Sequence, residues 1–154
     1  MIALKTILVA TDLSESGQPA LQHALALADV FNASLHVLHV VTEPLHEPWS
    51  GFVPATCFVE TVERLQIEAR HRLEALVPHD DRIVVAAAWG DASDQILKHA
   101  TSNHVDLVIC GTHGRRGWNR VVMGSVAERV VRLAPCPVMT VPAAPIIAAA
   151  CEAA

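Results

Sequence analysis

The chain has 154 residues, enough for one compact domain and too few for two domains with separate cores. Apolar residues make up 52% of the sequence and aromatic residues only 4%. The core must therefore be built from valine, leucine, isoleucine and alanine, the composition typical of a parallel α/β sheet covered by helices. A net charge of −5 argues against a general nucleic-acid binder, which needs a basic face.

Cysteine usage and hydropathy indicate the cellular compartment. The four cysteines are far apart, and no CxxC pair or histidine–cysteine cluster suggests a zinc or redox site. The apolar run at the amino terminus is shorter than a signal peptide and is closed by Asp12. No segment supplies the roughly 20 apolar residues of a membrane span. We therefore expect a soluble cytoplasmic protein with reduced thiols that binds neither nucleic acid nor membranes.

The first part of the chain predicts a strand, a helix and a second strand. Residues 5–11 and 34–41 are short runs rich in β-branched and aliphatic residues, and apolar residues recur at helical spacing from Leu21 to Phe31. The helix ends are predicted from local sequence: a cap at Ser14 or Ser16, a proline in the first turn at Pro19, and a left-handed end at Asn32.

The same alternation continues to residue 141. Helices are predicted at about 57–77, at 92–103 and at 125–134, and strands at 82–89, 105–111 and 135–141. Strictly alternating strands and helices predict a parallel sheet with helices on both faces, joined by right-handed crossovers. We expect one domain over residues 1–142. The low-complexity tail, residues 143–154, is expected to be poorly ordered or docked on a neighbour.

Polar and glycine residues follow two of the predicted strands. The first strand ends in Asp12 with hydroxyl residues around it, and the fourth strand ends directly in Gly111. Open parallel sheets bind ligands outside the carboxyl ends of their strands, where the strand order reverses. If these two strands are neighbours, both ends face one crevice.

A glycine-rich loop, GTHGRRGWNRVVMGSVAERVV, links the fourth strand to the last helix. Neither a Walker P-loop nor the dinucleotide fingerprint after the first strand is present. Glycines at 111, 114 and 124 allow the backbone to approach phosphate oxygens, and Gly124-Ser125 opens a helix whose N–H groups favour an anion. Ser125 can cap this helix and bind a phosphate. The alternative is a wide helix-entry loop, which also requires glycines.

Five of the eleven basic residues lie in or just after this loop. They fit either a phosphate site or an arginine-rich amphipathic helix. Within the loop, Arg115, Arg116 and Arg120 can each reach a triphosphate, and the sequence does not say which one does. Glu128 and Arg129 are interpreted as the solvated face of the last helix.

Other polar residues have a functional and a structural interpretation. Asp12 can bind magnesium or the ligand, or can simply favour a helix start through its charge. His113 can donate to a phosphate or serve only the turn. Cys110 is read as a small apolar residue. His36 and His39, three residues apart on a strand, are expected on opposite sides of the sheet and in structural roles.

Several motifs in combination resemble the universal stress protein family over residues 4–141. They are the G-x2-G-x9-G-S pattern after VDLVICG, with TILVATDLSESG at the start, WGDASDQIL mid-chain and APCPVMTV at the end. The resemblance implies a Rossmann-like open sheet of five parallel strands in the order 3-2-1-4-5, which makes the first and fourth strands neighbours. Family members with the glycine signature typically bind ATP, and those without it typically do not.

The resemblance also implies the binding residues for ATP, with Mg²⁺ held through the phosphates. Backbone and hydroxyl groups of the glycine signature would hold the ribose and phosphates, the end of the first strand would line the nucleotide, and the second strand would flank the adenine. In this sequence the expected residues are Ala10, Thr11, Asp12, Val40, Cys110, Gly111, His113, Gly114, Arg115, Gly124, Ser125 and Val126.

The function expected from these features is a nucleotide-dependent regulatory module with at most weak ATPase activity. Two alternatives stay open: an enzyme that cleaves a nucleotide phosphoanhydride or transfers AMP, and a nucleotide-free interaction protein. An apolar edge strand at the end of the sheet favours pairing with a second chain. Family members commonly dimerise through it, so a homodimer is expected, two dimers can stack as a tetramer, and the protein partner is unknown.

Overall fold

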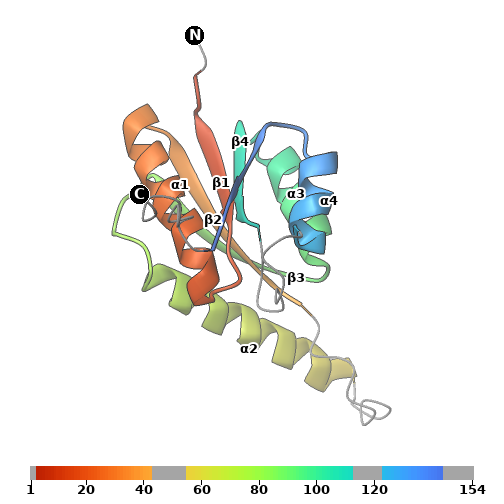
Figure 1. Cartoon of the computed structure of the whole chain (residues 1–154). Coiled ribbons are helices and arrows are strands. Elements are labelled where there is room, and N and C mark those ends of the chain that lie inside the picture. Colours follow the sequence, from red (N-terminus) through yellow and green to blue (C-terminus); the bar gives the residue numbers. More distant parts are fainter. Residues whose placement is uncertain (1–2, 43–54, 113–122, 144–154) are drawn as a thin grey trace, which may run out of the picture.

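The computed structural model describes residues 3–42, 55–112 and 123–143, and these form an open α/β sheet with helices on both faces (Figure 1). The five strands are parallel and lie in the order β3-β2-β1-β4-β5, as predicted. The strands are β1 (Thr6–Ala10), β2 (Ser34–Val41), β3 (Ile83–Trp89), β4 (Leu107–Gly111) and β5 (Val138–Val141). The helices are α1 (Gln18–Phe31), α2 (Ala55–Glu74), α3 (Ala92–Ser102) and α4 (Ser125–Leu133). Within these ranges no helix is long and apolar enough to cross a membrane.

Element boundaries differ from the prediction mainly at β5 and α2. β5 begins at Val138, three residues later than predicted, because Pro135 and Pro137 have no N–H group for the sheet. α2 begins two residues earlier than predicted and ends at Glu74, where a turn leads toward β3.

The sheet separates two apolar cores. Ile7 and Val9 of β1 face α1 and α2, and Leu8 faces α3 and α4. All three side chains are fully buried. Alternate residues of a strand point to opposite faces, so a continuous apolar run on β1 fills both cores. β1 is therefore held rigidly at the centre of the sheet, and its polar end is placed with the same precision.

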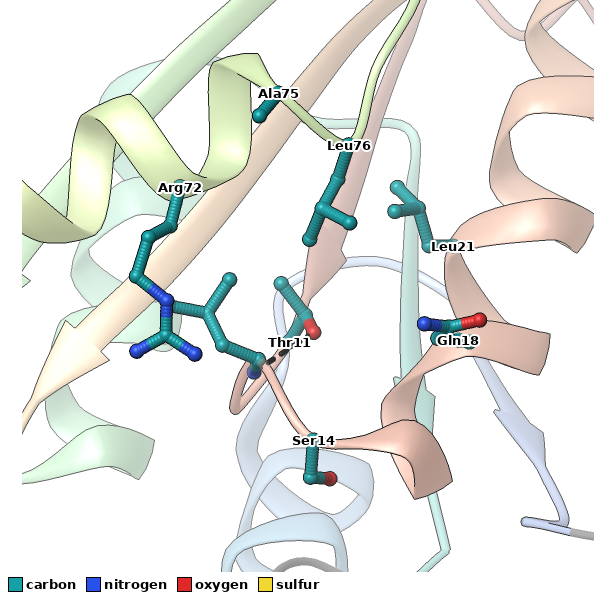
Figure 2. A pocket seen from close by; sticks show the side chains of 8 residues that line it. Thr11, Ser14, Gln18, Leu21, Arg72, Ala75 and Leu76 are labelled. Atoms are coloured by element: carbon teal, nitrogen blue, oxygen red, sulfur yellow. Dashed lines mark hydrogen bonds between the residues drawn. The ribbon is translucent and has the colours of Figure 1, made fainter.

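The entry to α1 differs from the predicted cap. A 3₁₀ turn, Glu15–Gly17, precedes the helix and Gly17 occupies the cap position. The Ser14 hydroxyl hydrogen-bonds Asp12 at 2.5 Å and Ser16 at 2.6 Å instead of a helix amide, so the prediction of Ser14 or Ser16 as cap was wrong. Figure 2 shows Ser14 and Gln18 at this entry, beside the end of β1.

The other end of α1 agrees with the sequence. Pro19 lies in the first turn, and Asn32 ends the helix with φ of 50°, the left-handed conformation that asparagine tolerates. Both predictions are confirmed.

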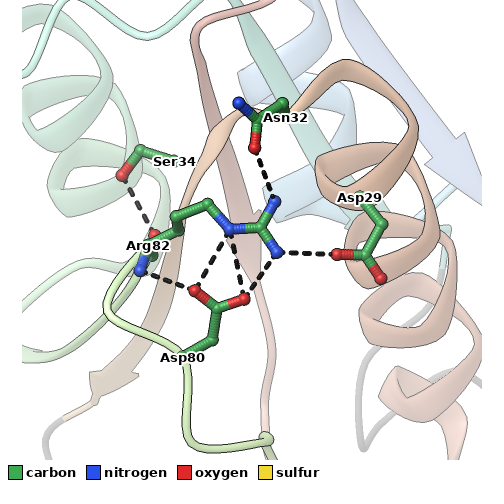
Figure 3. Close-up of polar contacts among 5 residues, drawn as sticks. All are labelled: Asp29, Asn32, Ser34, Asp80 and Arg82. Carbon is green, nitrogen blue, oxygen red and sulfur yellow. Dashed lines mark hydrogen bonds and ion pairs between the residues drawn. The ribbon is translucent and has the colours of Figure 1, made fainter.

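A cluster around Arg82 joins elements at the amino ends of the strands (Figure 3). Its guanidinium donates to Asp29 at 2.9 Å, to Asp80 at 2.5 Å and to Asn32 at 3.2 Å. Ser34 Oγ donates to the Arg82 carbonyl at 3.1 Å. Hydrogen bonds from Arg82 hold the pKa of Asp80 below its ordinary value. The cluster connects the end of α1 to the segment before β3. It lies at the amino ends of the strands, whereas the predicted ligand site lies at their carboxyl ends.

Candidate functional site

The carboxyl ends of β1 and β4 lie side by side. Ala10 of β1 is paired with Cys110 of β4, so the residues that follow each strand leave the sheet at the same edge. The strand order reverses at this point of the sheet, because β2 and β3 lie on one side of β1 and β4 and β5 lie on the other. The predicted neighbourhood of the first and fourth strands is confirmed, and it places Asp12 and Gly111 at the same end of the sheet, where open parallel sheets bind ligands.

The segment after β1 is tightly constrained. Thr11 donates its N–H to Leu38 of β2 at 3.0 Å, and Leu13 adopts a left-handed φ of 61° with its N–H on Thr11 Oγ1 at 3.2 Å. A Cβ at Gly17 would lie 2.9 Å from Thr11 Oγ1 and 3.0 Å from Asp12 Oδ1. Glycine is therefore required at 17 so that α1 can begin this close to the end of β1.

The Asp12 carboxylate is only half satisfied. Its Oδ1 accepts hydrogen bonds from the Ser14 N–H at 3.0 Å and from the Ser14 hydroxyl. Its Oδ2 is buried and has no hydrogen-bond partner in the part of the chain that the structure describes. A buried carboxylate oxygen without a partner is costly. Asp12 therefore presents an acceptor suited to a ligand donor or a cation.

The amino end of α4 is anchored to the same edge. Thr112 donates its N–H to Val141 of β5 at 2.9 Å, and its carbonyl accepts the Gly124 N–H at 2.8 Å. Gly124 is the N-cap of α4, so no side chain is available there to accept from the first-turn amides. These amides lack intrahelical partners and carry the positive end of the helix dipole.

Ser125 is the first residue of α4 and not its cap, so the prediction of a Ser125 cap was wrong. Its side chain and that of Val126 are exposed. The prediction that Gly124-Ser125 opens a helix is confirmed.

Two further predicted residues, Val40 and Cys110, are buried near the carboxyl ends of β2 and β4. Val40, near the end of β2, packs in the core beneath α3 and α4. Cys110 is buried, and burial raises the pKa of its thiol to about 11. Since the thiol stays protonated at neutral pH, Cys110 acts as a small apolar residue, as the sequence suggested.

The two strand histidines lie on opposite faces, as expected, and each has a structural partner. His39 Nδ1 donates to the Thr11 carbonyl at 2.8 Å and so helps to hold the end of β1. His36 Nδ1 lies 2.9 Å from His99 Nε2 on α3, with the two rings edge to face. Burial lowers the pKa of both histidines, and the charge of His36 adds to this effect at His99. The sequence analysis did not predict this pair, because no local sequence pattern indicates it.

Glu128 and Arg129 are both exposed on α4, which agrees with their interpretation as a solvated face, but Arg129 also makes contacts that the sequence did not predict. Its guanidinium reaches the start of α3, where it bonds Asp94 at 2.6 Å, Ser93 Oγ at 3.0 Å and Asp91 at 3.4 Å. Asp91 also caps α3 by accepting from the Asp94 N–H at 2.9 Å. The aspartate before the helix is a capping signal that the sequence does contain. Arg129 thus fixes α4 against α3.

Some predicted residues lie outside the described part of the chain. They are His113, Gly114 and Arg115, together with Arg116, Arg120 and the tail after Ala143. Among the described residues no group of three or more histidine, cysteine, aspartate or glutamate side chains could hold a metal ion.

An open parallel sheet with polar groups beyond its switch point has the architecture of α/β domains that bind small ligands at the carboxyl ends of their strands. The sequence model of the protein family described as "Universal stress protein family" matches residues 3–142 of this chain. The chain therefore belongs to this family.

This chain aligns with known proteins over most of their length and most of its own. Universal stress protein MJ0531 of Methanocaldococcus jannaschii is 32% identical over 142 residues, covering 89% of this chain and 81% of the relative. The solved structure of protein MJ0577 aligns with a TM-score of 0.77 at 27% identity, covering 92% of this chain and 97% of that one. A universal stress protein in complex with cAMP shares the fold, with a TM-score of 0.63 at 23% identity, and covers 93% of this chain and 100% of that one.

Proposed function

We propose that this protein is an ATP-binding regulatory module whose nucleotide site is the crevice between β1, β4 and the amino end of α4. The observation that carries the proposal is the anchoring of an α4 terminus without a side-chain cap beside the half-satisfied Asp12 carboxylate. Backbone amides at a helix start bind phosphate, and a buried acceptor binds a donor or a cation. One crevice therefore offers both.

Each residue has a defined part in this proposal. Phosphates are bound by the first-turn amides of α4, including that of Val126, and by the Ser125 hydroxyl. Asp12 accepts from the nucleoside or binds Mg²⁺ carried by the phosphates, and Val40 provides apolar surface for the base. The choice of ATP rests on family membership and on the glycine signature. The cAMP complex of a protein with the same fold agrees with an adenine nucleotide.

The module is proposed to act by binding, in the cytoplasm, with at most weak ATPase activity. Efficient phosphoryl transfer needs a positioned base or nucleophile beside the phosphates. Asp12 Oδ1 is held by Ser14, and burial keeps Cys110 protonated, so neither group is arranged as a reactive base. The nucleotide then acts as a ligand that stabilises one conformation of the crevice.

The direct test is the nucleotide content of the purified protein. The protein is denatured, and the supernatant is analysed by anion-exchange chromatography. We expect adenine nucleotide close to one per chain, or uptake to that level after incubation with ATP and Mg²⁺. A protein that is empty and also fails to take up ATP would refute the proposal and favour the nucleotide-free interaction protein.

Replacing Asp12 with asparagine should separate ligand binding from stability. The amide keeps an oxygen for Ser14 but replaces the unpartnered Oδ2 with a neutral donor, so ATP affinity should fall about 10- to 100-fold. The free energy of unfolding of the ligand-free protein should stay the same or rise, because a neutral amide costs less to bury than a carboxylate. Calorimetric titration and urea denaturation measure the two effects. A fall in stability with unchanged affinity would mean that Asp12 serves only the α1 entry.

We also propose a homodimer through β5. This strand lies at one edge of the sheet, with β4 on its other side, and an edge strand offers unpaired N–H and C=O groups to a second chain. Sedimentation velocity should give the mass of two chains. Replacing Thr140 with proline removes one β5 N–H and should shift the protein toward monomer. A monomeric wild type would contradict this assembly.

A further inference from the structure

A cavity lies on the face of the sheet opposite to Val40 and Cys110. Its volume is about 200 Å³, and it opens between the start of α1 and the end of α2 (Figure 2). We call it the α1–α2 cavity. Leu21 of α1 and Leu76 after α2 form apolar walls, and Thr11, Gln18 and Arg72 add polar groups. Of these residues only Thr11 belongs to the proposed nucleotide site.

Four polar side chains line this cavity: Arg72 can only donate hydrogen bonds, whereas Thr11, Ser14 and Gln18 can donate and accept. Gln18 projects from α1 and Arg72 from the last turn of α2, on opposite sides of the cavity. In the described part of the chain neither side chain makes a hydrogen bond or ion pair. Thr11 Oγ1 already accepts from the Leu13 N–H, so its hydroxyl proton is available to donate.

Nearby carboxylates do not neutralise Arg72. Asp12 accepts from Ser14 and does not line the cavity. Glu74, on the same helix, pairs with His71 at 3.4 Å. The cavity is open to solvent, with Gln18, Arg72 and Leu76 exposed. It combines a guanidinium that has no ion-pair partner among the described residues with an amide, two hydroxyls and leucine side chains. This combination is complementary to an anion that carries an apolar body.

We propose that the α1–α2 cavity binds a small branched aliphatic monocarboxylate. A guanidinium matches the two oxygens of a carboxylate in a bidentate arrangement, and Gln18 and Thr11 supply further donors. The volume corresponds to roughly seven water molecules, which suits a ligand of about seven non-hydrogen atoms. The leucine walls favour an aliphatic body over a bare inorganic anion, which would leave them facing water.

The test is a titration of the ¹⁵N-labelled protein with isovalerate, followed by NMR. We expect saturable shifts centred on the amides of Leu13, Gln18 and Arg72, with a dissociation constant of roughly millimolar order for so small a ligand. Isovaleramide has the same shape without the charge, and we expect it to bind at least about tenfold more weakly.

Variants locate the site and separate it from nucleotide binding. Arg72→Gln should weaken isovalerate binding about tenfold or more, and Arg72→Lys should retain part of it through its charge. Arg70→Gln is the matched control, since Arg70 is exposed on the same helix and does not line the cavity. Gly124→Trp, which targets the nucleotide site, should leave isovalerate binding unchanged whether or not ATP binds.

Three results would overturn the proposal. They are the absence of saturable shifts, equal binding of the amide, and equal binding by folded Arg72→Gln.

Discussion

Replacing Gly124 with tryptophan is expected to abolish nucleotide binding while leaving the fold intact. The backbone of Gly124 has φ of −63° and ψ of 149°, an extended conformation open to any residue. A tryptophan therefore fits the main chain, and its indole covers the amino end of α4. Losing several charge-assisted hydrogen bonds to phosphate should lower ATP affinity about 100-fold or more.

Two measurements check this expectation. Calorimetric titration with ATP and Mg²⁺ gives the affinity, and thermal unfolding without nucleotide should show only a small change. Gln22→Trp provides the matched control, because it adds the same side chain at an exposed position on α1. If the Gly124 variant binds ATP as tightly as the Gln22 variant, the phosphates do not lie at the start of α4.

Acidification from pH 7 to pH 5 is expected to destabilise the protein through His36 and His99. Burial holds the pKa of each histidine below the ordinary 6.5. Unfolding restores the ordinary value, so below that pH the unfolded chain binds more protons than the folded one. Stability is therefore complete above about pH 6.5 and is lost as the pH falls, by at most about 1.4 kcal/mol per pH unit for each histidine.

The hydrogen bond between the two rings couples the protonation of His36 to that of His99, so both contribute to the loss of stability at low pH. With an N–N distance of 2.9 Å, one ring must donate and the other must accept. When both rings are protonated, neither nitrogen can accept, and two positive charges meet in a half-buried site. This hydrogen bond between β2 and α3 is then lost.

Urea denaturation at several pH values measures this dependence. The double variant His36→Leu with His99→Leu removes both titrating groups, and its stability should change much less between pH 5 and 7. A single substitution leaves a polar ring unpartnered and should cost about 1–3 kcal/mol at neutral pH. His79→Gln, at an exposed position, should retain the wild-type slope. An unchanged slope in the double variant would assign the acid effect to other groups.

Most of the architecture was predictable because its signals are local. The alternation of strand and helix patterns predicted the parallel sheet, and Asn32 marked a helix end through its own conformational preference. The strand order came from family resemblance, since periodicity alone does not say which strands are neighbours. Local signals failed at Ser14, whose hydroxyl could bond either a helix amide or the Asp12 carboxylate and bonds the carboxylate.

By itself the sequence determined the fold class and the places of Asp12 and Gly124 at the ends of their elements, because spacing and composition within short windows encode them. Motif resemblance determined the family. Only the tertiary structure decided the pairings between distant segments. His36 and His99 are 63 residues apart, Arg129 reaches Asp94 on another helix, and Arg72 and Gln18 share a cavity. Such contacts depend on strand order and helix packing, which bring together side chains that no short stretch of sequence relates.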